Sequence, residues 1–319
     1  RGEGVSSGSC RGLDTSNYST CPGCCDGETG RQAARLLEVA PGALGLRQSE
    51  ALFQHVKRLP GLLESLREDG ALEMPVSVVG ASTKPRWVEG SYMPCFLAGE
   101  SVGRSIAASL GVPFFACSHQ QGHIAAAAWA SGRIDLLDRP CLAWHLSGGT
   151  TELLLVEPEA GNVRAVKLGG TSDLSAGQLI DRTGVALGLS FPAGKGVDAL
   201  AAESGEGAHF RVKLDGLTFS LSGVENQVKG LLHRGAPPQD AARYALLTVI
   251  DAVERATERA LEQHPGLPVL FSGGVSSNAL LRTMAGRRFE AVFAPPVYST
   301  DNAMGVAVLA CRALAGGRL

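Results

Sequence analysis

The sequence predicts an α/β protein built from two lobes. Its 319 residues are enough for two lobes of ordinary domain size, and the 45% of apolar residues can fill a core in each. Short apolar runs typical of strands alternate along the chain with patterns of helical periodicity, which is the order expected of an α/β architecture. The pattern restarts after Ser131-Gly132, so we expect a lobe boundary near residue 135.

The first lobe should contain short strands joined by helices. Residues 12–16 are predicted to be the end of a short strand and a polar turn, and further strands are predicted at residues 76–79 and 113–117. Helices are predicted at residues 52–63, at 97–110 and, rich in alanine, directly after the third strand. Pro60 should kink or split the first of these helices, and Gly111 should stop the second.

The second lobe repeats this alternation. Strands are predicted at residues 141–146, 153–156 and 268–271, and a long helix at 238–263. The chain closes with a helix that starts at Asp301 and runs to about Leu314. We therefore expect an N-terminal lobe at residues 1–135, a C-terminal lobe at 136–301, and a last helix, 302–319, that packs back onto the N-terminal lobe.

Charge and hydropathy restrict the classes of function. The net charge is −2, whereas a protein that binds RNA tightly by itself is usually basic. If RNA is a substrate, a local patch or a partner protein must supply positive charge. No apolar run is long enough to span a membrane, and the first nine residues lack the apolar core of a signal peptide. We expect a cytoplasmic protein.

The chain has eight cysteines, and four of them fall within the first 25 residues. The others stand singly in apolar runs, where a cysteine behaves as a small hydrophobic residue. This spacing is not that of a secreted disulfide framework, and it indicates a reducing compartment. Cys21-Pro22-Gly23-Cys24 has the form of half a zinc site or a redox pair, but no second such motif exists. We interpret it as an incidental cysteine-rich loop.

Three strand ends run directly into small polar turns: Asp14-Thr15-Ser16, Ser147-Gly148-Gly149 and Ser272-Gly273-Gly274. Glycine lets the backbone approach phosphate oxygens, and free N–H groups in such turns can bind them. In open α/β sheets, ligands lie beyond the carboxyl ends of strands. None of the three turns matches a Walker A loop or a dinucleotide fingerprint. Together they predict a site for a nucleotide or another phosphate compound.

His119 and His123 are four residues apart on the alanine-rich helix, which places both imidazoles on one face. They could share a metal ion, or they could be two histidines that only cap the helix. A third ligand must come from elsewhere in the chain. Asp301, taken alone, is interpreted as an ordinary helix N-cap. Asp181, taken alone, is interpreted as an exposed carboxylate on a helix, although it could also bind ribose hydroxyls.

Several short motifs follow one another in a characteristic order. They are Leu13-Asp14-Thr15-Ser16, Ala98-Gly99-Glu100-Ser101, His119-Gln120-Gln121-Gly122-His123, Ser147-Gly148-Gly149, Ala176-Gly177-Gln178-Leu179-Ile180-Asp181, Gly188-Leu189-Ser190-Phe191-Pro192-Ala193-Gly194, Gly273-Gly274-Val275-Ser276-Ser277-Asn278 and Thr300-Asp301-Asn302. In this order the chain resembles the Kae1/TsaD (Gcp-like) family of tRNA threonylcarbamoyladenosine synthases, formerly described as endopeptidases. The resemblance covers nearly the whole chain from about residue 10.

The resemblance implies an actin/Hsp70-like (ASKHA) fold with the nucleotide in a cleft between the lobes. It also implies one metal ion, iron or zinc, held by the ligands His119, His123 and Asp301. The implied nucleotide- and substrate-binding residues are Asp14, Ser147, Gly148, Gly149, Asp181, Gly194 and Asn278. The implied small molecule is ATP, AMP or threonylcarbamoyl-adenylate.

The implied reaction transfers the threonylcarbamoyl group from this adenylate to N6 of adenine 37 in tRNA, with a metal as Lewis acid and template. Partner proteins, a same-fold heterodimer or a homodimer are expected to help bind tRNA. Departures from the family pattern, Ser118 for His, Gln121 for Glu and Gln178 for Glu, point to a divergent branch. The alternatives are a paralogue that binds or hydrolyses a nucleotide but uses another acceptor, and a non-catalytic partner subunit.

Overall fold

A computed structural model describes residues 8–39 and 46–319, and it divides into two compact units. Unit 1 comprises Arg1–Arg139, Glu157–Ala165 and Asp301–Leu319, and unit 2 comprises Pro140–Val156 and Val166–Thr300. The expected boundaries differ from these in three places, because the prediction put residues 136–139, 157–165 and Asp301 in the C-terminal lobe.

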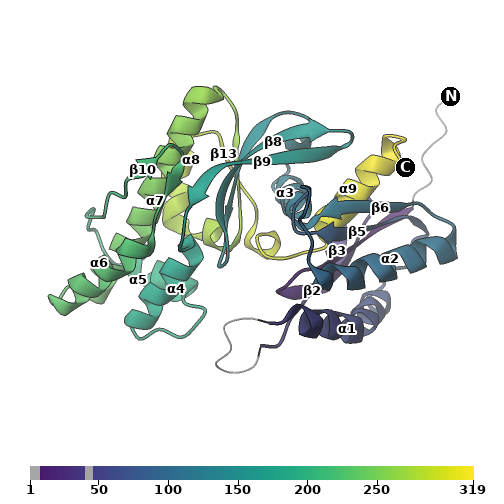
Figure 1. The fold of residues 1–319 in the computed structure, drawn as a ribbon, viewed down its shortest axis with the longest axis horizontal. Helices are drawn as coiled ribbons and strands as arrows, with labels where there is room; N and C mark the ends of the chain where they lie inside the picture. The colour runs from purple at the N-terminus through teal and green to yellow at the C-terminus, as the bar shows by residue number, and fades with distance from the viewer. Residues whose placement is uncertain (1–7, 40–45) are drawn as a thin grey trace. The chain divides into compact units, whose positions relative to one another are not determined.

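Unit 1 is a mixed sheet with helices on both faces (Figure 1). Its strands lie in the order β3-β2-β1-β5-β6, with β4 paired to β2; β1 is antiparallel to β2 and parallel to β5, which is parallel to β6. The strands are β1 (Ser9–Thr15), β2 (Ser19–Cys25), β3 (Gly30–Gln32), β4 (Arg35–Leu36), β5 (Val76–Lys84) and β6 (Phe114–Ser118). The helices are α1 (Gln48–Glu68), η1 (Pro94–Phe96), α2 (Leu97–Leu110), α3 (His119–Ala130), η2 (Ile134–Leu137) and α9 (Met304–Ala315).

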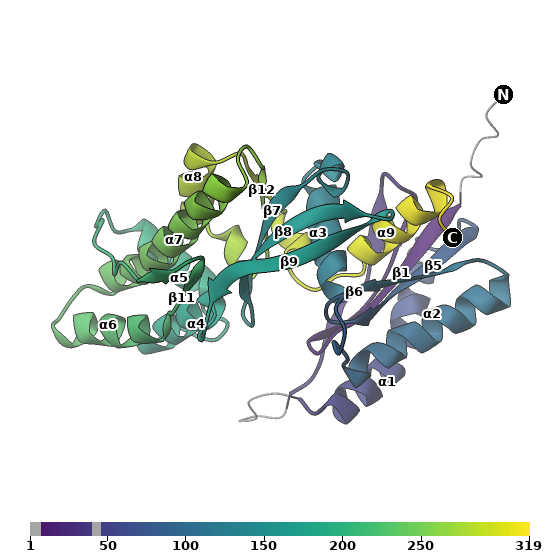
Figure 2. The same cartoon turned by 45° about the horizontal axis from the view of Figure 1, so that its top comes forward.

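Glycines allow α9 to lie very close to the centre of this sheet and to α3. A Cβ atom on Gly12 of β1 would fall 2.4 Å from the carbonyl oxygen of Ala303. A Cβ atom on Gly305 of α9 would fall 1.7 Å from the carbonyl oxygen of Gly122 of α3. Figure 2 shows α9 on one face of β1 and β5, with α1 and α2 on the other. The small residues therefore bring the end of the chain against its first strand.

Two local expectations were wrong. The cysteine-rich segment after the first turn is the strand β2, not a loop, and Cys21, Cys24 and Cys25 are buried in it. Pairing with β1 on one side and with β3 and β4 on the other overrides the poor strand propensity of Pro22 and Gly23. The helix α1 is not split at Pro60: it is continuous from Gln48 to Glu68, with Pro60 exposed and the adjacent Leu59 buried in the core.

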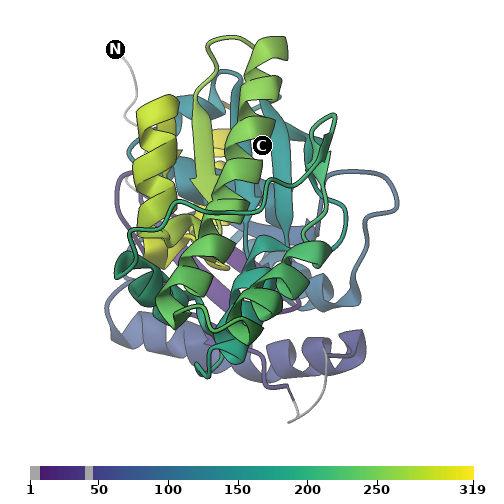
Figure 3. The same ribbon diagram turned by 90° about the vertical axis from the view of Figure 1, so that its left-hand side faces the viewer.

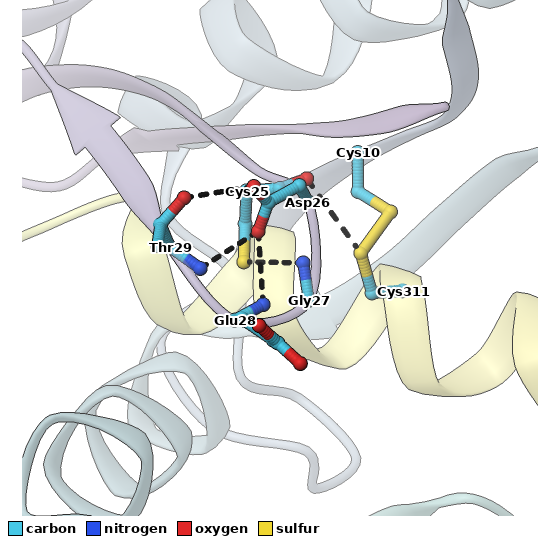
Figure 4. Close-up of a disulfide and its surroundings, with 7 residues drawn as sticks. All are labelled: Cys10, Cys25, Asp26, Gly27, Glu28, Thr29 and Cys311. Atoms are coloured by element: carbon cyan, nitrogen blue, oxygen red, sulfur yellow. Dashed lines mark hydrogen bonds between the residues drawn. A yellow bond between two sulfur atoms is a disulfide. The ribbon is translucent and has the colours of Figure 1, made fainter. Parts of the chain in front are cut away.

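A disulfide joins Cys10 of β1 to Cys311 of α9 (Figure 4). This corrects the expectation that Cys10 and Cys311 are free thiols. The two residues are 301 positions apart in sequence, so spacing could not reveal the pair. Cys25 lies opposite Cys10 in the β1–β2 ladder, and its sulfur accepts a hydrogen bond from the Gly27 N–H at 3.2 Å. Cys25 remains a free buried thiol.

Unit 2 contains a seven-stranded sheet in the order β10-β11-β9-β8-β7-β12-β13. Its strands are β7 (Cys141–Leu146), β8 (Thr151–Glu159), β9 (Asn162–Thr171), β10 (Leu214–Asp215), β11 (Thr218–Phe219), β12 (Val269–Ser272) and β13 (Ala291–Phe293). The outer ends of β8 and β9 belong to unit 1. The helices are α4 (Ala176–Ala186), α5 (Gly194–Ala202), α6 (Ser222–His233), α7 (Pro238–Gln263), η3 (Gly274–Ser277), α8 (Ala279–Arg288) and η4 (Pro296–Tyr298).

The core of unit 2 lies between this sheet and α7 (Figure 3). Trp144 of β7 is fully buried there, and its indole N–H donates to Thr257 Oγ1 of α7 at 2.9 Å. Val249 and Val253 of α7 pack in the same cluster. Within the described residues, no helix is both long and apolar enough to cross a membrane.

Candidate functional site

The helix α3 begins with a capping box that sets the direction of its first turn. Ser118 Oγ accepts a hydrogen bond from the Gln121 N–H at 3.2 Å, and Gln121 Oε1 accepts one from the Ser118 N–H at 2.8 Å. Gln121 Nε2 also donates to the Val163 carbonyl at 2.6 Å. Ser118 and Gln121 depart from the family's motif, and both are engaged in this structural role. Gln178 does the same at the start of α4, where it forms a capping box with Ser175.

Three side chains of unit 1 converge just beyond this turn. His119 Nε2 and His123 Nε2 are 3.0 Å apart, and Asp301 Oδ1 lies 3.6 Å from the first and 3.2 Å from the second. Ligand atoms on a tetrahedral ion with bonds of about 2.0–2.1 Å are separated by about 3.3–3.4 Å. The cluster therefore has the size and the donor types of a site for one metal ion. Asp301 lies in the segment before α9 and is not its N-cap, a position that Ala303 occupies.

Asp14 fixes the orientation of His119. The Nδ1–H of His119 donates to the two oxygens of Asp14 at 2.9 and 3.0 Å, which leaves Nε2 directed at the cluster. Ser82 of the neighbouring strand β5 donates to Asp14 Oδ1. Asp14 is only 1% exposed. The carboxylate expected to bind nucleotide is thus hydrogen-bonded to the histidine and to the serine.

The charges of the cluster perturb its titration strongly. Burial lowers the pKa of His119, but the carboxylates of Asp14 and Asp301 outweigh this effect and raise the pKa to about 9. Burial raises the pKa of Asp301, yet the two imidazoles hold that pKa well below its ordinary value. Without a metal ion, a proton on His119 therefore takes the place of the positive charge between the carboxylates.

Asp301 is held by serines from the turn between β1 and β2. Ser16 Oγ donates to Asp301 Oδ2, and Ser19 Oγ lies 3.4 Å from the same oxygen. Ser16 is held in turn by His55 of α1, whose Nε2–H donates to the Ser16 carbonyl at 2.8 Å while Nδ1 accepts from Thr20 Oγ1. Burial lowers the pKa of His55. No sequence pattern indicates His55, whereas Ser16 belongs to the motif Leu13-Asp14-Thr15-Ser16.

In unit 2, the turn Ser147–Thr150 follows β7 and meets the start of α4. Gly177 N–H donates to the Ser147 carbonyl at 3.2 Å, and Ser175 Oγ donates to the Gly148 carbonyl at 2.7 Å. A Cβ atom on Gly177 would lie 2.6 Å from Gly148 Cα, so only glycine permits this approach. No Cβ atom on Gly148 itself would meet anything within 4 Å. The turn is thus braced from one side by α4 and open around Gly148, as a phosphate-binding turn requires.

The remaining predicted residues of unit 2 gather around α5. Asp181 of α4 accepts a hydrogen bond from the Ala193 N–H at 2.8 Å, directly before Gly194 begins α5. Asn278 Nδ2 donates to Asp198 Oδ1 of α5 at 2.8 Å. The structure therefore connects Asp181, Gly194 and Asn278 through α5. Asp198 was not predicted, because a lone aspartate on a short helix carries no motif.

Comparison with known proteins agrees with this order of motifs. Residues 43–308 match the family model described as TsaD, tRNA N6-adenosine threonylcarbamoyltransferase. An enzyme of that name from Thermus thermophilus is 33% identical over 264 residues, which cover 81% of this chain and 78% of that protein. An enzyme of the same name from Streptococcus pneumoniae is 32% identical over 248 residues, or 75% of this chain and 70% of that protein.

Solved structures at low sequence identity show the fold. Full-length HypF in its phosphate- and nucleotide-bound form superposes with a TM-score of 0.60 at 14% identity, over 98% of this chain and 56% of that one. Component A of the Acidaminococcus fermentans (R)-2-hydroxyglutaryl-CoA dehydratase gives 0.54 at 15% identity, over 97% and 100%. A ROK family glucokinase from Streptomyces griseus gives 0.52 at 13% identity, over 96% and 100%. The predicted actin/Hsp70-like fold class is confirmed.

Proposed function

We propose that this chain, which belongs to the TsaD family of tRNA N6-adenosine threonylcarbamoyltransferases, transfers the threonylcarbamoyl group of threonylcarbamoyl-adenylate to N6 of adenine 37 of tRNA. The observation that carries the proposal is the convergence of His119, His123 and Asp301 in a chain of this family. We further propose that these side chains hold one iron or zinc ion and that the protein acts in the cytoplasm.

The residues of unit 1 would only bind and orient the substrates, because the adenylate is already an activated acyl donor. A metal ion held there would supply Lewis-acid polarisation of a substrate oxygen. Asp14 keeps the Nδ1 proton on His119, so that Nε2 offers its lone pair to the ion. Ser16 holds the second oxygen of Asp301 and so keeps Oδ1 turned toward the histidines.

The residues of unit 2 would hold the nucleotide part. We propose that the turn Ser147-Gly148-Gly149 binds the phosphate that leaves as AMP, through backbone N–H groups, with the open space at Gly148 in support. Asp181, Gly194 and Asn278 would contact the adenosine part around the start of α5. Transfer needs no protein nucleophile in this scheme, since the acceptor amine attacks the carbamoyl carbon and AMP departs.

The test is a transfer assay with the full chain. Threonylcarbamoyl-adenylate and an unmodified tRNA that decodes ANN codons are incubated with the metal-loaded protein, alone and with candidate partner proteins, and the nucleosides are analysed after digestion. We expect the modified nucleoside from the parent chain, loss of at least tenfold in rate from His119→Ala, and parent-like rates from His233→Ala, whose side chain is exposed on α6. Absence of the modified nucleoside under every combination overturns the proposal.

The same assay separates the two alternatives. Release of AMP without a modified nucleoside would indicate a paralogue with another acceptor. Neither AMP nor nucleoside, together with binding of a same-fold partner, would indicate a non-catalytic subunit. The retained ligand set weighs against the second alternative, because a scaffold has no use for three convergent ligands from distant parts of the chain. The capping roles of Gln121 and Gln178 weigh against the first, since these departures are explained without a change of substrate.

A further inference from the structure

Three large aromatic side chains of unit 1 are exposed at one edge of its sheet. The exposed fractions are 61% for Tyr18, 48% for Trp87 and 62% for Tyr92. Tyr18 lies in the turn that follows β1, and the other two lie in the loop of residues 85–93 that follows β5. Because β1 and β5 are parallel neighbours, both segments leave the sheet at its carboxyl edge. We call these three side chains the aromatic rim.

The aromatic rim borders the candidate metal centre. The turn that carries Tyr18 also supplies Ser16, which bonds Asp301. On the other side, Pro85 begins the loop, and its carbonyl accepts a hydrogen bond from the N–H of Gln120, the neighbour of His119, at 3.0 Å. The two segments of the rim therefore flank the ligand cluster from β1 and from β5.

The two segments are also tied to each other. Gln48 Nε2 donates to Asn17 Oδ1 at 2.8 Å, and Gln48 Oε1 accepts from the Cys95 N–H at 3.3 Å. Thr15 Oγ1 donates to the Cys95 carbonyl at 3.1 Å. Inside the loop, Ser91 Oγ accepts from the Arg86 N–H at 3.0 Å. The exposed rings thus project from a braced backbone, so that binding to them orders few further residues.

Positive charge accompanies the rings. Lys84 Nζ lies 4.6 Å from the centroid of the Trp87 ring, and Arg86 is exposed on the same loop. Glu89 is the only carboxylate of residues 84–93. Aromatic rings interleaved with cations are the side chains that bind unpaired nucleotides, because the rings stack on bases and the cations meet phosphates. Stacking does not depend on net charge, so it suits a chain whose net charge is −2.

We propose that the aromatic rim is the platform on which the chain binds the unpaired loop of its RNA acceptor, with at least one base stacked on Trp87 or Tyr92 and a phosphate at Lys84. The proposal rests on the proposed function for the choice of tRNA. It assigns the loop of residues 85–93 to recognition of the nucleotides that flank the modified adenine. A protein partner would use the same exposed rings without needing phosphate contacts.

Binding is measured by fluorescence anisotropy with a labelled RNA stem-loop that carries an adenine in its unpaired loop, and with the metal-loaded full chain. We expect Trp87→Ala and Tyr92→Ala to weaken binding by about 5- to 150-fold each, the range for loss of one base–aromatic stack. The matched control is Phe53→Ala. Phe53 is 56% exposed and lies 5.2 Å from Lys57 Nζ, but it projects from α1 on the side opposite His55.

The salt dependence of RNA binding distinguishes the contribution of Lys84 from that of the aromatic rings. We expect Lys84→Ala to reduce the slope of log affinity against log salt concentration by about 0.7, the value for one phosphate contact with a single strand. Trp87→Ala should leave this slope unchanged, and so should Lys57→Ala. Metal content and thermal melting should match those of the parent for all these variants, since every altered side chain is outside the cores.

The proposal is overturned if the parent chain does not bind the stem-loop, or if Trp87→Ala and Tyr92→Ala both bind it within twofold of the parent. Loss of a protein partner with normal RNA binding in these variants would also overturn it. Failure of the proposed function has a different signature. In that case the rim variants lose RNA affinity while no chain, parent included, forms the modified nucleoside.

Discussion

Asp14 offers the sharpest test of how the metal centre is built. Its carboxylate touches His119 but is 1% exposed, so that its contribution to metal binding passes through the imidazole. Carboxylates that orient a ligand histidine contribute about 10- to 100-fold in metal affinity, or roughly 1.4–2.8 kcal/mol. Asp14→Asn keeps an acceptor oxygen for Nδ1–H and loses the charge, so we expect about tenfold weaker binding. Asp14→Ala removes both and should weaken binding by about 100-fold.

Affinity for Zn²⁺ is measured by competition with a chromophoric chelator at pH 7.5, with Asp135→Asn as the control. Asp135 is a half-exposed carboxylate in a surface ion pair, and its loss should leave affinity unchanged. Thermal melting of the metal-free variants shows whether the fold is retained. Zinc affinity of both Asp14 variants within threefold of the parent would refute the orienting role that we assign to this carboxylate.

Three further predictions concern pH, packing and the disulfide. The pKa of His119 is raised from 6.5 to about 9, so protonation of this side chain should stabilise the metal-free protein fully below pH 6.5. As the pH rises through 9, the unfolding free energy measured in urea should fall by up to about 3 kcal/mol, and a free energy that does not change with pH contradicts this prediction. Gly305→Ala should destabilise unit 1 by about 1–3 kcal/mol and reduce bound metal, because the added Cβ would overlap the Gly122 carbonyl. In the same urea assay the control Gly286→Ala in α8, where a Cβ meets no atom within 4 Å, should stabilise the protein by about 0.5–1 kcal/mol. Reduction of Cys10–Cys311, which closes a loop of 301 residues, should lower stability by about 6 kcal/mol in the chain-entropy model. In the same urea assay, a Cys10→Ser, Cys311→Ser double variant should no longer respond to reductant.

Helical periodicity alone predicted that the two histidines of the candidate metal site lie together. His119 and His123 share a helix face because of the 3.6-residue repeat, and no tertiary information is needed to place them together. Asp301 could be assigned only from the order of motifs, since its approach depends on α9 packing against α3 and β1. Ser16 contacts Asp301, and His55 contacts Ser16. Each of these contacts depends on how two separate elements pack, so the sequence pattern of either element alone does not predict it.

The errors have the same origin. β2 was missed because Pro22 and Gly23 are poor strand residues, but the neighbouring strands on both sides provide partners for its backbone. Gly23 has a tertiary role there, since a Cβ atom on it would come within 3.3 Å of Ala303 Cβ. The nucleotide-binding role expected of Asp14, which ends a strand as the glycine turns do, stays a prediction. Its hydrogen-bond partners Ser82 and His119 come from the strand β5 and the helix α3, so its contacts depend on tertiary structure.

The packing of α9 on β1 also determines when during synthesis unit 1 can be completed. The two residues joined by the disulfide are 301 positions apart, and at about 5–20 residues per second the ribosome needs about 15–60 s to travel between them. During that interval the sheet face above Gly12 lacks its covering helix, while all of unit 2 is being translated. A nascent chain that stops before Asp301 therefore lacks both this residue and the helix α9 that closes the first unit. Such truncated products should be substrates for chaperones and proteases rather than partially active enzymes.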